Sequence, residues 1–284
     1  MRILLANVAC AVEDSDESRF VKEILVPLWK RNFDLVRQKD TDIIARFPGW
    51  GIGALDGFFY SYIDALNSQS VFHAAVAAEK EGFDAVLIMC FGDPMLWQIR
   101  QAVNIPVVGL GESSILLAAM MGLKFGIVTI SPYNIPEMEH TIAKYGLQHR
   151  YAGARANSET GDEQGAAIVD ARRAIESFRE AATELVRDGA EIVIPGCGLL
   201  SPALRLAPAA ETEYPEGVTT VGGAAVMDIL STALKTAETL IALKRAGSSW
   251  ISRTRLFARP TDRAREAGRI VLKDDRMIYW DVQL

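Results

Sequence analysis

One short phrase occurs in both halves of the sequence and ends each time in a cysteine. Residues 82–90 read GFDAVLIMC and residues 189–197 read GAEIVIPGC, so that glycine, an acidic residue, valine and cysteine recur at the same offsets. Each copy follows a helix-like segment, AAVAAEKEG in the first case and AATELVRDG in the second. The repeat predicts two related halves, each of which places one thiol at the same end of an equivalent strand.

The first copy indicates a buried strand followed by a helix. Residues 84–89, DAVLIM, are too few and too continuously apolar for an amphipathic helix, and are typical of a strand that is buried on both faces. After Cys90, Asp93 is a good N-cap and Pro94 suits a first helical position, so we expect a helix over residues 93–103. A helix that begins so close to a thiol favours its thiolate form. A lone cysteine in an apolar strand is more often an inert core residue, and only the repeat favours a functional interpretation.

Strands alternate with helices along most of the chain, which favours a parallel α/β architecture. We expect two similar parallel-sheet α/β halves related by a pseudo-twofold axis, with the active site in the cleft between them. Residues 1–122 and 218–246 are assigned to the first half and residues 123–217 to the second, because strand 218–221 corresponds to strand 105–109. Residues 247–284 are expected to form a C-terminal extension that ends in a hairpin, with Asp274 and Asp275 near its turn.

Three further segments lie outside the two cysteine phrases. Residues 152–164 are rich in small and polar side chains and are interpreted as a loop. Residues 198–217 hold three prolines and are expected to be either a loop that covers the cleft or a long connector. Residues 224–246 are expected to be one continuous helix.

The composition argues against several kinds of partner. Lys and Arg number 30 and Asp and Glu number 36, which gives a formal charge of −6, and no basic run or interleaved aromatic patch indicates a nucleic-acid partner. No apolar stretch approaches the roughly 18 residues of a membrane helix, and the amino terminus resembles a first strand rather than a signal peptide. Three cysteines without a CxxC pair fit reduced thiols. We therefore expect a cytoplasmic protein with no membrane or nucleic-acid partner.

Two thiols that face each other across a cleft can remove a proton from one face of a carbon atom and return one to the other face. An ordinary cysteine has a pKa of about 8.5, so one of the two must be assisted. The turn amides at Phe91-Gly92 and Gly198-Leu199 are candidates for this, and also for holding the oxygen of an enolate. For such an arrangement we expect the two sulfur atoms to lie roughly 7 to 9 Å apart.

Other kinds of site have weaker support. Thr129 and Ser131 follow a strand of the second half, at the end where open α/β sheets build their sites, and are candidate substrate contacts. The three histidines have no zinc-ligand spacing with each other or with cysteine, and no GxSxG motif is present, so neither a metal centre nor a serine hydrolase is expected. Cys10 is interpreted as a structural residue. No metal and no cofactor are expected.

Four phrases of the chain resemble the aspartate/glutamate/hydantoin racemase superfamily, and within it the hydantoin racemases. They are CFGDP at 90–94, IPVVGLGE at 105–112, FGIVT at 125–129 and GCG at 196–198, in the same order as in that group. The resemblance covers most of residues 1–246. It implies a cofactor-independent, two-base racemase or epimerase that acts at a carbon acid of a small substrate, of hydantoin type or related to it, with Cys90 and Cys197 as the acid/base pair. A homo-oligomer is expected.

The chain departs from the hydantoin racemase pattern in its first loop. Those enzymes usually have Asn-Pro-Asn-Thr-Ser after the first strand, whereas here Asn7 is followed by VACA. That loop contacts the substrate in the family, which makes Asn7 a candidate substrate-binding residue. Maleate isomerases keep both cysteines in a Cys-Thr-Ser type of context, and arylmalonate decarboxylases keep only the second. A maleate-type isomerase or a decarboxylase is therefore the first alternative, and a non-catalytic sensor of small ligands is the second.

Overall fold

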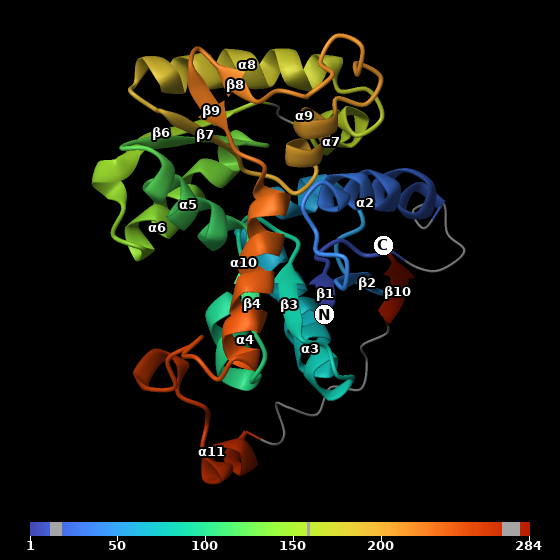
Figure 1. Cartoon of the computed structure of the whole chain (residues 1–284), viewed down its shortest axis with the longest axis vertical. Coiled ribbons are helices and arrows are strands. Elements are labelled where there is room, and N and C mark those ends of the chain that lie inside the picture. Colours follow the sequence, from blue (N-terminus) through green and yellow to red (C-terminus); the bar gives the residue numbers. More distant parts are fainter. Residues whose placement is uncertain (12–18, 158–159, 269–278) are drawn as a thin grey trace.

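The computed structural model describes residues 1–11, 19–157, 160–268 and 279–284. Its strands form two five-stranded sheets, which lie one above the other in Figure 1 with helices against their faces. The first sheet contains β1 (Arg2–Ala6), β2 (Asp42–Pro48), β3 (Ala85–Ile88), β4 (Val107–Gly109) and β10 (Tyr279–Gln283). The second contains β5 (Phe125–Thr129), β6 (Tyr151–Ala156), β7 (Ile192–Pro195), β8 (Thr220–Val221) and β9 (Ala224–Val226).

The two sheets repeat one arrangement of four parallel strands. The order is β2-β1-β3-β4 in the first sheet and β6-β5-β7-β9 in the second, and every neighbouring pair in these two sets is parallel. In each sheet the strand of the cysteine phrase, β3 or β7, lies directly beside the strand that opens that half. The expectation of two similar parallel α/β halves is confirmed.

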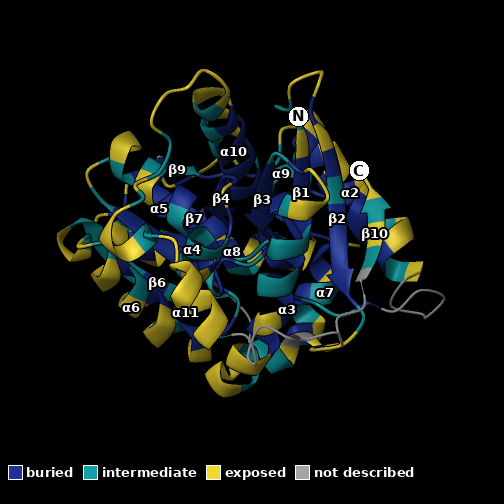
Figure 2. Cartoon of the chain, turned by 90° about the horizontal axis from the view of Figure 1, so that it is seen from below, coloured by how far each residue is buried: buried dark blue, intermediate teal, exposed yellow. Residues whose placement is uncertain are grey.

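Helices connect these strands and cover them. In chain order they are η1 (Val21–Leu25), α2 (Val26–Asp34), η2 (Leu55–Phe59), α3 (Ser61–Lys80), α4 (Leu96–Ala102), α5 (Leu110–Met121), η3 (Pro132–Asn134), α6 (Ile135–Lys144), η4 (Gln148–Arg150), α7 (Gly161–Ala167), α8 (Arg172–Arg187), α9 (Leu200–Leu206), α10 (Ile229–Arg245), η5 (Arg255–Phe257) and α11 (Asp262–Ala267). Figure 2 shows the central strands in the buried colour and α11 as an exposed helix, and Figure 1 shows that α11 lies at the lower end of the molecule. None of the helices within the described ranges has both the length and the apolar character needed to cross a bilayer.

The two predicted loops contain regular structure. Residues 152–164 include most of strand β6 and the start of helix α7, which Thr160 caps by accepting the amide hydrogen of Glu163. Backbone pairing with β5 sets β6, so a local sequence of small residues does not reveal it. Residues 198–217 include helix α9, where Pro202 is tolerated because it lies in the first turn, whose amides have no partner within the helix.

The segment 218–246 divides differently from the prediction. Strands β8 and β9 both belong to the second sheet, and β9 rather than 218–221 takes the place that β4 has in the first. Residues 224–226 are therefore a strand, and helix α10 begins only at Ile229, after Asp228 accepts the amide hydrogen of Ser231. Helix α10 itself packs on α5, β3 and β4 (Figure 1), so the chain returns to the first half about ten residues later than expected.

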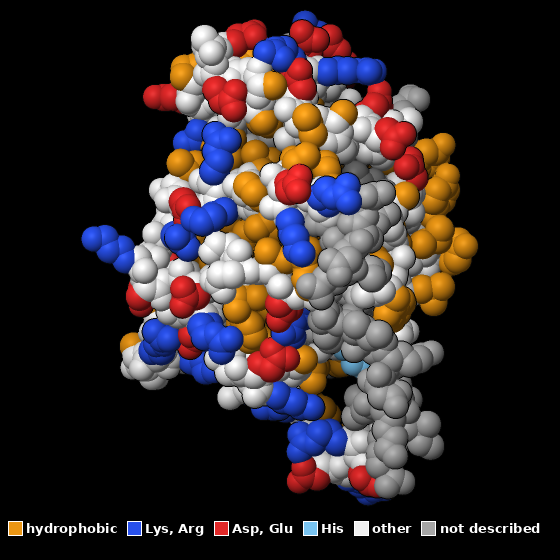
Figure 3. Space-filling view, turned by 90° about the vertical axis from the view of Figure 1, so that its right-hand side faces the viewer, with side chains coloured by type: hydrophobic (Ala, Val, Ile, Leu, Met, Phe, Trp, Pro, Cys, Tyr) orange, Lys and Arg blue, Asp and Glu red, His pale blue; other side chains and the backbone are white. Residues whose placement is uncertain are grey.

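The end of the chain adds a strand to the first sheet. Strand β10 pairs antiparallel with β2, at the edge of the sheet away from β4. The predicted hairpin turn at Asp274 and Asp275 lies outside the described residues. On the face shown in Figure 3, basic and acidic side chains are interspersed rather than gathered by sign.

Candidate active site

A cavity of about 340 Å³ lies between the two halves and is bordered by the carboxyl ends of strands from both sheets. From the first sheet, Asn7 follows β1 and Cys90 follows β3. From the second, Thr129 ends β5 and Cys197 follows β7. Both cysteines of the repeated phrase therefore border one cavity, at the end of the sheets where parallel α/β folds bind ligands.

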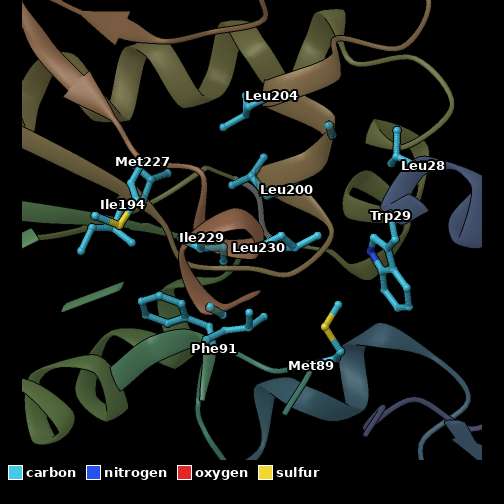
Figure 4. Close-up of a cluster of buried hydrophobic side chains, with 14 of the residues drawn as sticks. Leu28, Trp29, Met89, Phe91, Ile194, Leu200, Leu204, Met227, Ile229 and Leu230 are labelled. Carbon is cyan, nitrogen blue, oxygen red and sulfur yellow. The ribbon is translucent and has the colours of Figure 1, made fainter. Parts of the chain in front are cut away.

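Apolar packing between the halves holds the cavity walls in place. In Figure 4, Met89 and Phe91 lie opposite Leu200 of α9, and Trp29 of α2 approaches from the side. Trp29, Met89 and Phe91 also border the cavity, so one layer of side chains serves both packing and the site. The indole Nε1 of Trp29 donates a hydrogen bond to the carbonyl oxygen of Gly198, at 3.2 Å. This bond ties the first half to the turn that carries Cys197.

The thiol of Cys90 belongs to a half-buried residue and lies in an acidic setting. Shielding from water raises its pKa well above the ordinary value, and the nearby carboxyl groups of Asp64 and Glu137 raise it further. The backbone amide of Gly92 donates to the sulfur and opposes this rise. Cys90 is therefore held in its protonated form.

The thiol of Cys197 has a different setting. Shielding from water raises its pKa too, but the backbone amides of Leu199 and Leu200 donate to the sulfur and lower it, and among the described residues no carboxyl group contributes to the shift. The Leu199 amide nitrogen lies 3.3 Å from the sulfur. Of the two thiols, Cys197 is therefore the one that ionises more readily.

Most of the residues predicted for substrate contact border the cavity. They are Asn7, Phe91, Gly92, Thr129, Gly198 and Leu199. The prediction of Ser131 as a substrate contact is corrected, because this residue is fully buried and does not border the cavity. Its hydroxyl oxygen accepts the amide hydrogen of Tyr133 at 3.4 Å. Its hydroxyl caps the short helix η3 instead of facing a ligand.

Asp93 does not cap the helix that follows it. Helix α4 begins only at Leu96, and the carboxylate of Asp93 instead accepts the amide hydrogens of Gly111 at 3.0 Å and Glu112 at 2.6 Å, in the first turn of α5. The predicted helix start beside the thiol is therefore wrong. The turn amide of Gly92, rather than the end of a helix, is the donor to Cys90.

Burial raises the pKa of Asp93 to about 7, although the two amide hydrogen bonds act in the opposite direction. In the unfolded chain this carboxyl group ionises near pH 4. Because the folded protein binds this proton more tightly, protonation stabilises the fold fully below pH 4, and this stabilisation is lost as the pH rises to about 7. We expect the free energy of unfolding to fall by up to about 1.4 kcal/mol per pH unit across this window, and Asp93→Asn to flatten the slope. Urea unfolding of both proteins at several pH values checks this, and identical slopes would contradict it.

Gly111 lets helix α5 approach the Cys90 turn. A Cβ atom at this position would lie 2.2 Å from the carbonyl oxygen of Phe91. We expect Gly111→Ala to destabilise the fold by about 1–3 kcal/mol, as overpacking does, and to lower activity by displacing the turn. Gly165→Ala is the control for stability in urea unfolding, because Gly165 lies in α7 with open space around it. Equal stability of the two variants would refute the expectation.

Among the residues that border the cavity but that the sequence did not indicate are Cys10, Asp64, Asn134 and Glu137, whose side chains are polar or ionisable. Asp64 lies on α3, Asn134 in η3 and Glu137 on α6, and none of these segments carries a recognisable motif. No disulfide joins Cys10, Cys90 and Cys197. Within the described ranges, no group of three or more His, Cys, Asp or Glu side chains has an arrangement that could hold a metal ion.

Comparison with known proteins gives one family and a set of similar enzymes. The Asp/Glu/Hydantoin racemase family model matches residues 60–231. A hydantoin racemase from Pseudomonas sp. (strain NS671) is 29% identical over 216 residues, which are 74% of this chain and 78% of that protein. A hydantoin racemase from Paenarthrobacter aurescens is 28% identical over 226 residues, with coverage of 78% and 86%.

The solved structure of an allantoin racemase from Klebsiella pneumoniae has the same overall fold. It superimposes with a TM-score of 0.70 at 25% identity and covers 92% of this chain and 94% of its own. The matched family segment includes both cysteine phrases and all of α3, α5 and α6.

Proposed function

The chain belongs to the Asp/Glu/hydantoin racemase family, and from this membership we propose that it racemises a small carbon acid of the hydantoin or allantoin type. The thiols of Cys90 and Cys197 carry out the reaction without a cofactor. The observation that carries the proposal is that both thiols follow equivalent strands and border one cavity. A carbon atom held between them would have one sulfur on each face, which inversion by two bases requires. The 7 to 9 Å separation stays a prediction.

The settings of the two thiols suggest their roles at the start of a turnover. Cys197 takes the proton from the carbon atom as thiolate, and Cys90 delivers a proton to the opposite face as thiol. The roles are exchanged for the other enantiomer. In the resting protein the carboxyl groups near Cys90 and the amides at Cys197 favour the state in which Cys197 is the thiolate and Cys90 is the thiol.

Asn7 is suited to hold the enolate oxygen that develops as the proton leaves. Asn7 borders the cavity and is 5% exposed. Its Oδ1 accepts the amide hydrogen of Ala9, and its Nδ2 is buried with no hydrogen-bond partner. A buried donor without a partner is costly unless a ligand engages it. The amides of Gly92 and Leu199, which the sequence also suggested for this task, already donate to the thiols.

The proposal is tested with pure enantiomers of allantoin and of several 5-substituted hydantoins, by following optical rotation. We expect the rotation of at least one of them to decay to zero with no change in composition. Isomerisation of maleate or decarboxylation of an arylmalonate, with no racemisation, would favour the alternative enzymes of the superfamily. Binding of these compounds without any turnover would favour a ligand sensor.

We also propose that the protein assembles as a homo-oligomer in the cytoplasm, where reduced thiols persist. Light scattering of the purified protein tests the assembly.

We propose the division into two halves with one boundary moved, so that residues 218–228 belong to the second half and α10 belongs to the first.

A further inference from the structure

Hydrogen-bond acceptors gather on one wall of the cavity, on the side of Cys90. Asn134 is 8% exposed, and its Nδ2 donates to the carbonyl oxygen of Phe58 at 3.1 Å, which fixes the orientation of its amide. Its Oδ1 is left buried with no hydrogen-bond partner, in a residue that borders the cavity. A buried acceptor of this kind indicates a ligand with a donor group.

Two carboxyl groups continue the same wall. The Oδ1 of Asp64 is likewise buried without a hydrogen-bond partner. Glu137 follows Asn134 by one helical turn and borders the cavity, although the residue as a whole is exposed. The two carboxyl groups are close enough for Asp64 to raise the pKa of Glu137. A Cβ atom at Gly92 would lie 3.4 Å from Oε1 of Glu137 and 3.8 Å from the sulfur of Cys90, so this carboxyl group approaches the reacting thiol.

The part of the cavity wall that the structure describes provides no cationic side chain to balance these carboxyl groups. Among the described residues that border it there is no Lys, Arg or His. Lys144 and His140 border only a second, outer hollow that shares Asn134 and Glu137 with the cavity. A substrate carboxylate in the cavity would therefore meet two acidic groups and no counter-charge.

We propose that Asp64, Asn134 and Glu137 form the substrate-selecting wall of this site. They accept hydrogen bonds from N–H groups of a neutral, ureide-type substrate, and they exclude analogues that carry a carboxylate. The inference rests on the proposed function, because it names which members of the hydantoin class the site takes.

Both parts of this selection follow from the cost of burying mismatched groups. A ligand that lacks N–H donors leaves the Oδ1 atoms of Asp64 and Asn134 unpaired. A site built around polar contacts binds such a ligand much more weakly. A ligand carboxylate would lie beside Asp64 and Glu137 in a cavity lined mainly by apolar side chains, where like charges repel more strongly than in bulk water. Replacing both wall carboxylates by amides removes the repulsion and leaves the size of the wall unchanged.

The test compares two ligands that differ by one group, hydantoin-5-acetamide and hydantoin-5-acetate. Binding of each is measured by isothermal titration calorimetry and racemisation of each by polarimetry, for the parent protein, for the variant Asp64→Asn with Glu137→Gln, and for Glu139→Gln. Glu139 lies on the same helix as Glu137 but does not border the cavity. Glu139→Gln is therefore the control for removing a negative charge from this helix outside the cavity. Unfolding midpoints show whether each variant is folded.

We expect the parent protein to prefer the acetamide at least tenfold in binding, and the double variant to reduce this preference at least fivefold, while Glu139→Gln leaves it unchanged. An unchanged preference in the folded double variant would overturn the inference, as would tighter binding of the acetate by the parent protein. Asn134→Leu is expected to weaken the acetamide more than the acetate, and equal weakening of both would count against the wall. Binding with this preference but without racemisation by the parent protein would leave the selection intact and refute the proposed function.

Discussion

Cys90→Ser and Cys197→Ser are each expected to lower racemisation at least about a thousandfold in both directions, because inversion needs a proton donor or acceptor on each face of the carbon atom. Hydroxyl groups of serine are far weaker acids than thiols and cannot supply the thiolate. The measurement is the initial rate of change in optical rotation for each pure enantiomer. Cys10→Ser is the matched control, because Cys10 borders the same cavity and has no role in the proposed chemistry.

Each cysteine variant keeps one base, and this gives a second readout. The remaining thiolate can remove a proton and return one to the same face, so each variant is expected to exchange the substrate hydrogen with solvent for one enantiomer only. Cys90→Ser and Cys197→Ser are expected to differ in which enantiomer this is. Racemisation at the parental rate by either variant, or exchange of the same enantiomer by both, would refute the two-thiol mechanism.

Iodoacetamide is expected to modify Cys197 at least about tenfold faster than Cys90 at neutral pH, since the thiolate is the reacting form. Burial raises the pKa of both thiols; carboxyl groups raise that of Cys90 further, whereas two amide hydrogen bonds oppose the rise at Cys197. A more basic thiolate is the better nucleophile, but this offsets only about half of the difference in ionisation. Mass spectrometry of the two cysteine peptides over time gives both rates.

The same experiment on a variant tests the cause of the difference between the thiols. Asp64→Asn together with Glu137→Gln is expected to raise the rate at Cys90 and leave the rate at Cys197 unchanged. Faster modification of Cys90 than of Cys197 in the parent protein would contradict the assignment of the resting states.

The repeated phrase predicted the main features of the fold because it combines local and long-range information. A glycine turn, a buried apolar run and a cysteine fix a strand and its carboxyl end, and the second copy shows that this arrangement is used twice. In the structure, β3 and β7 occupy equivalent places in sheets of the same order, and Cys90 and Cys197 border one cavity. The turn residues next to both thiols follow directly from that placement.

The parts that the sequence did not predict depend on contacts between distant segments. Asp93 caps α5 rather than its own helix because the turn after β3 folds back onto Gly111, which no local pattern reveals. Strand β6 forms by pairing with β5, although four of its six residues are alanine or glycine. Asp64 and Glu137 come together from α3 and α6, so their joint effect on Cys90 exists only in the folded chain.

The most direct test of the two-thiol mechanism is racemisation of a single enantiomer in D2O, stopped after a small fraction has turned over. With one thiol on each face, the proton removed stays on the first thiol while a deuteron arrives from the second. We therefore expect the newly formed enantiomer to carry deuterium at the chiral carbon atom and the recovered starting enantiomer to remain unlabelled. Equal labelling of both enantiomers at this early stage would show that a single base serves both faces, and would contradict the account.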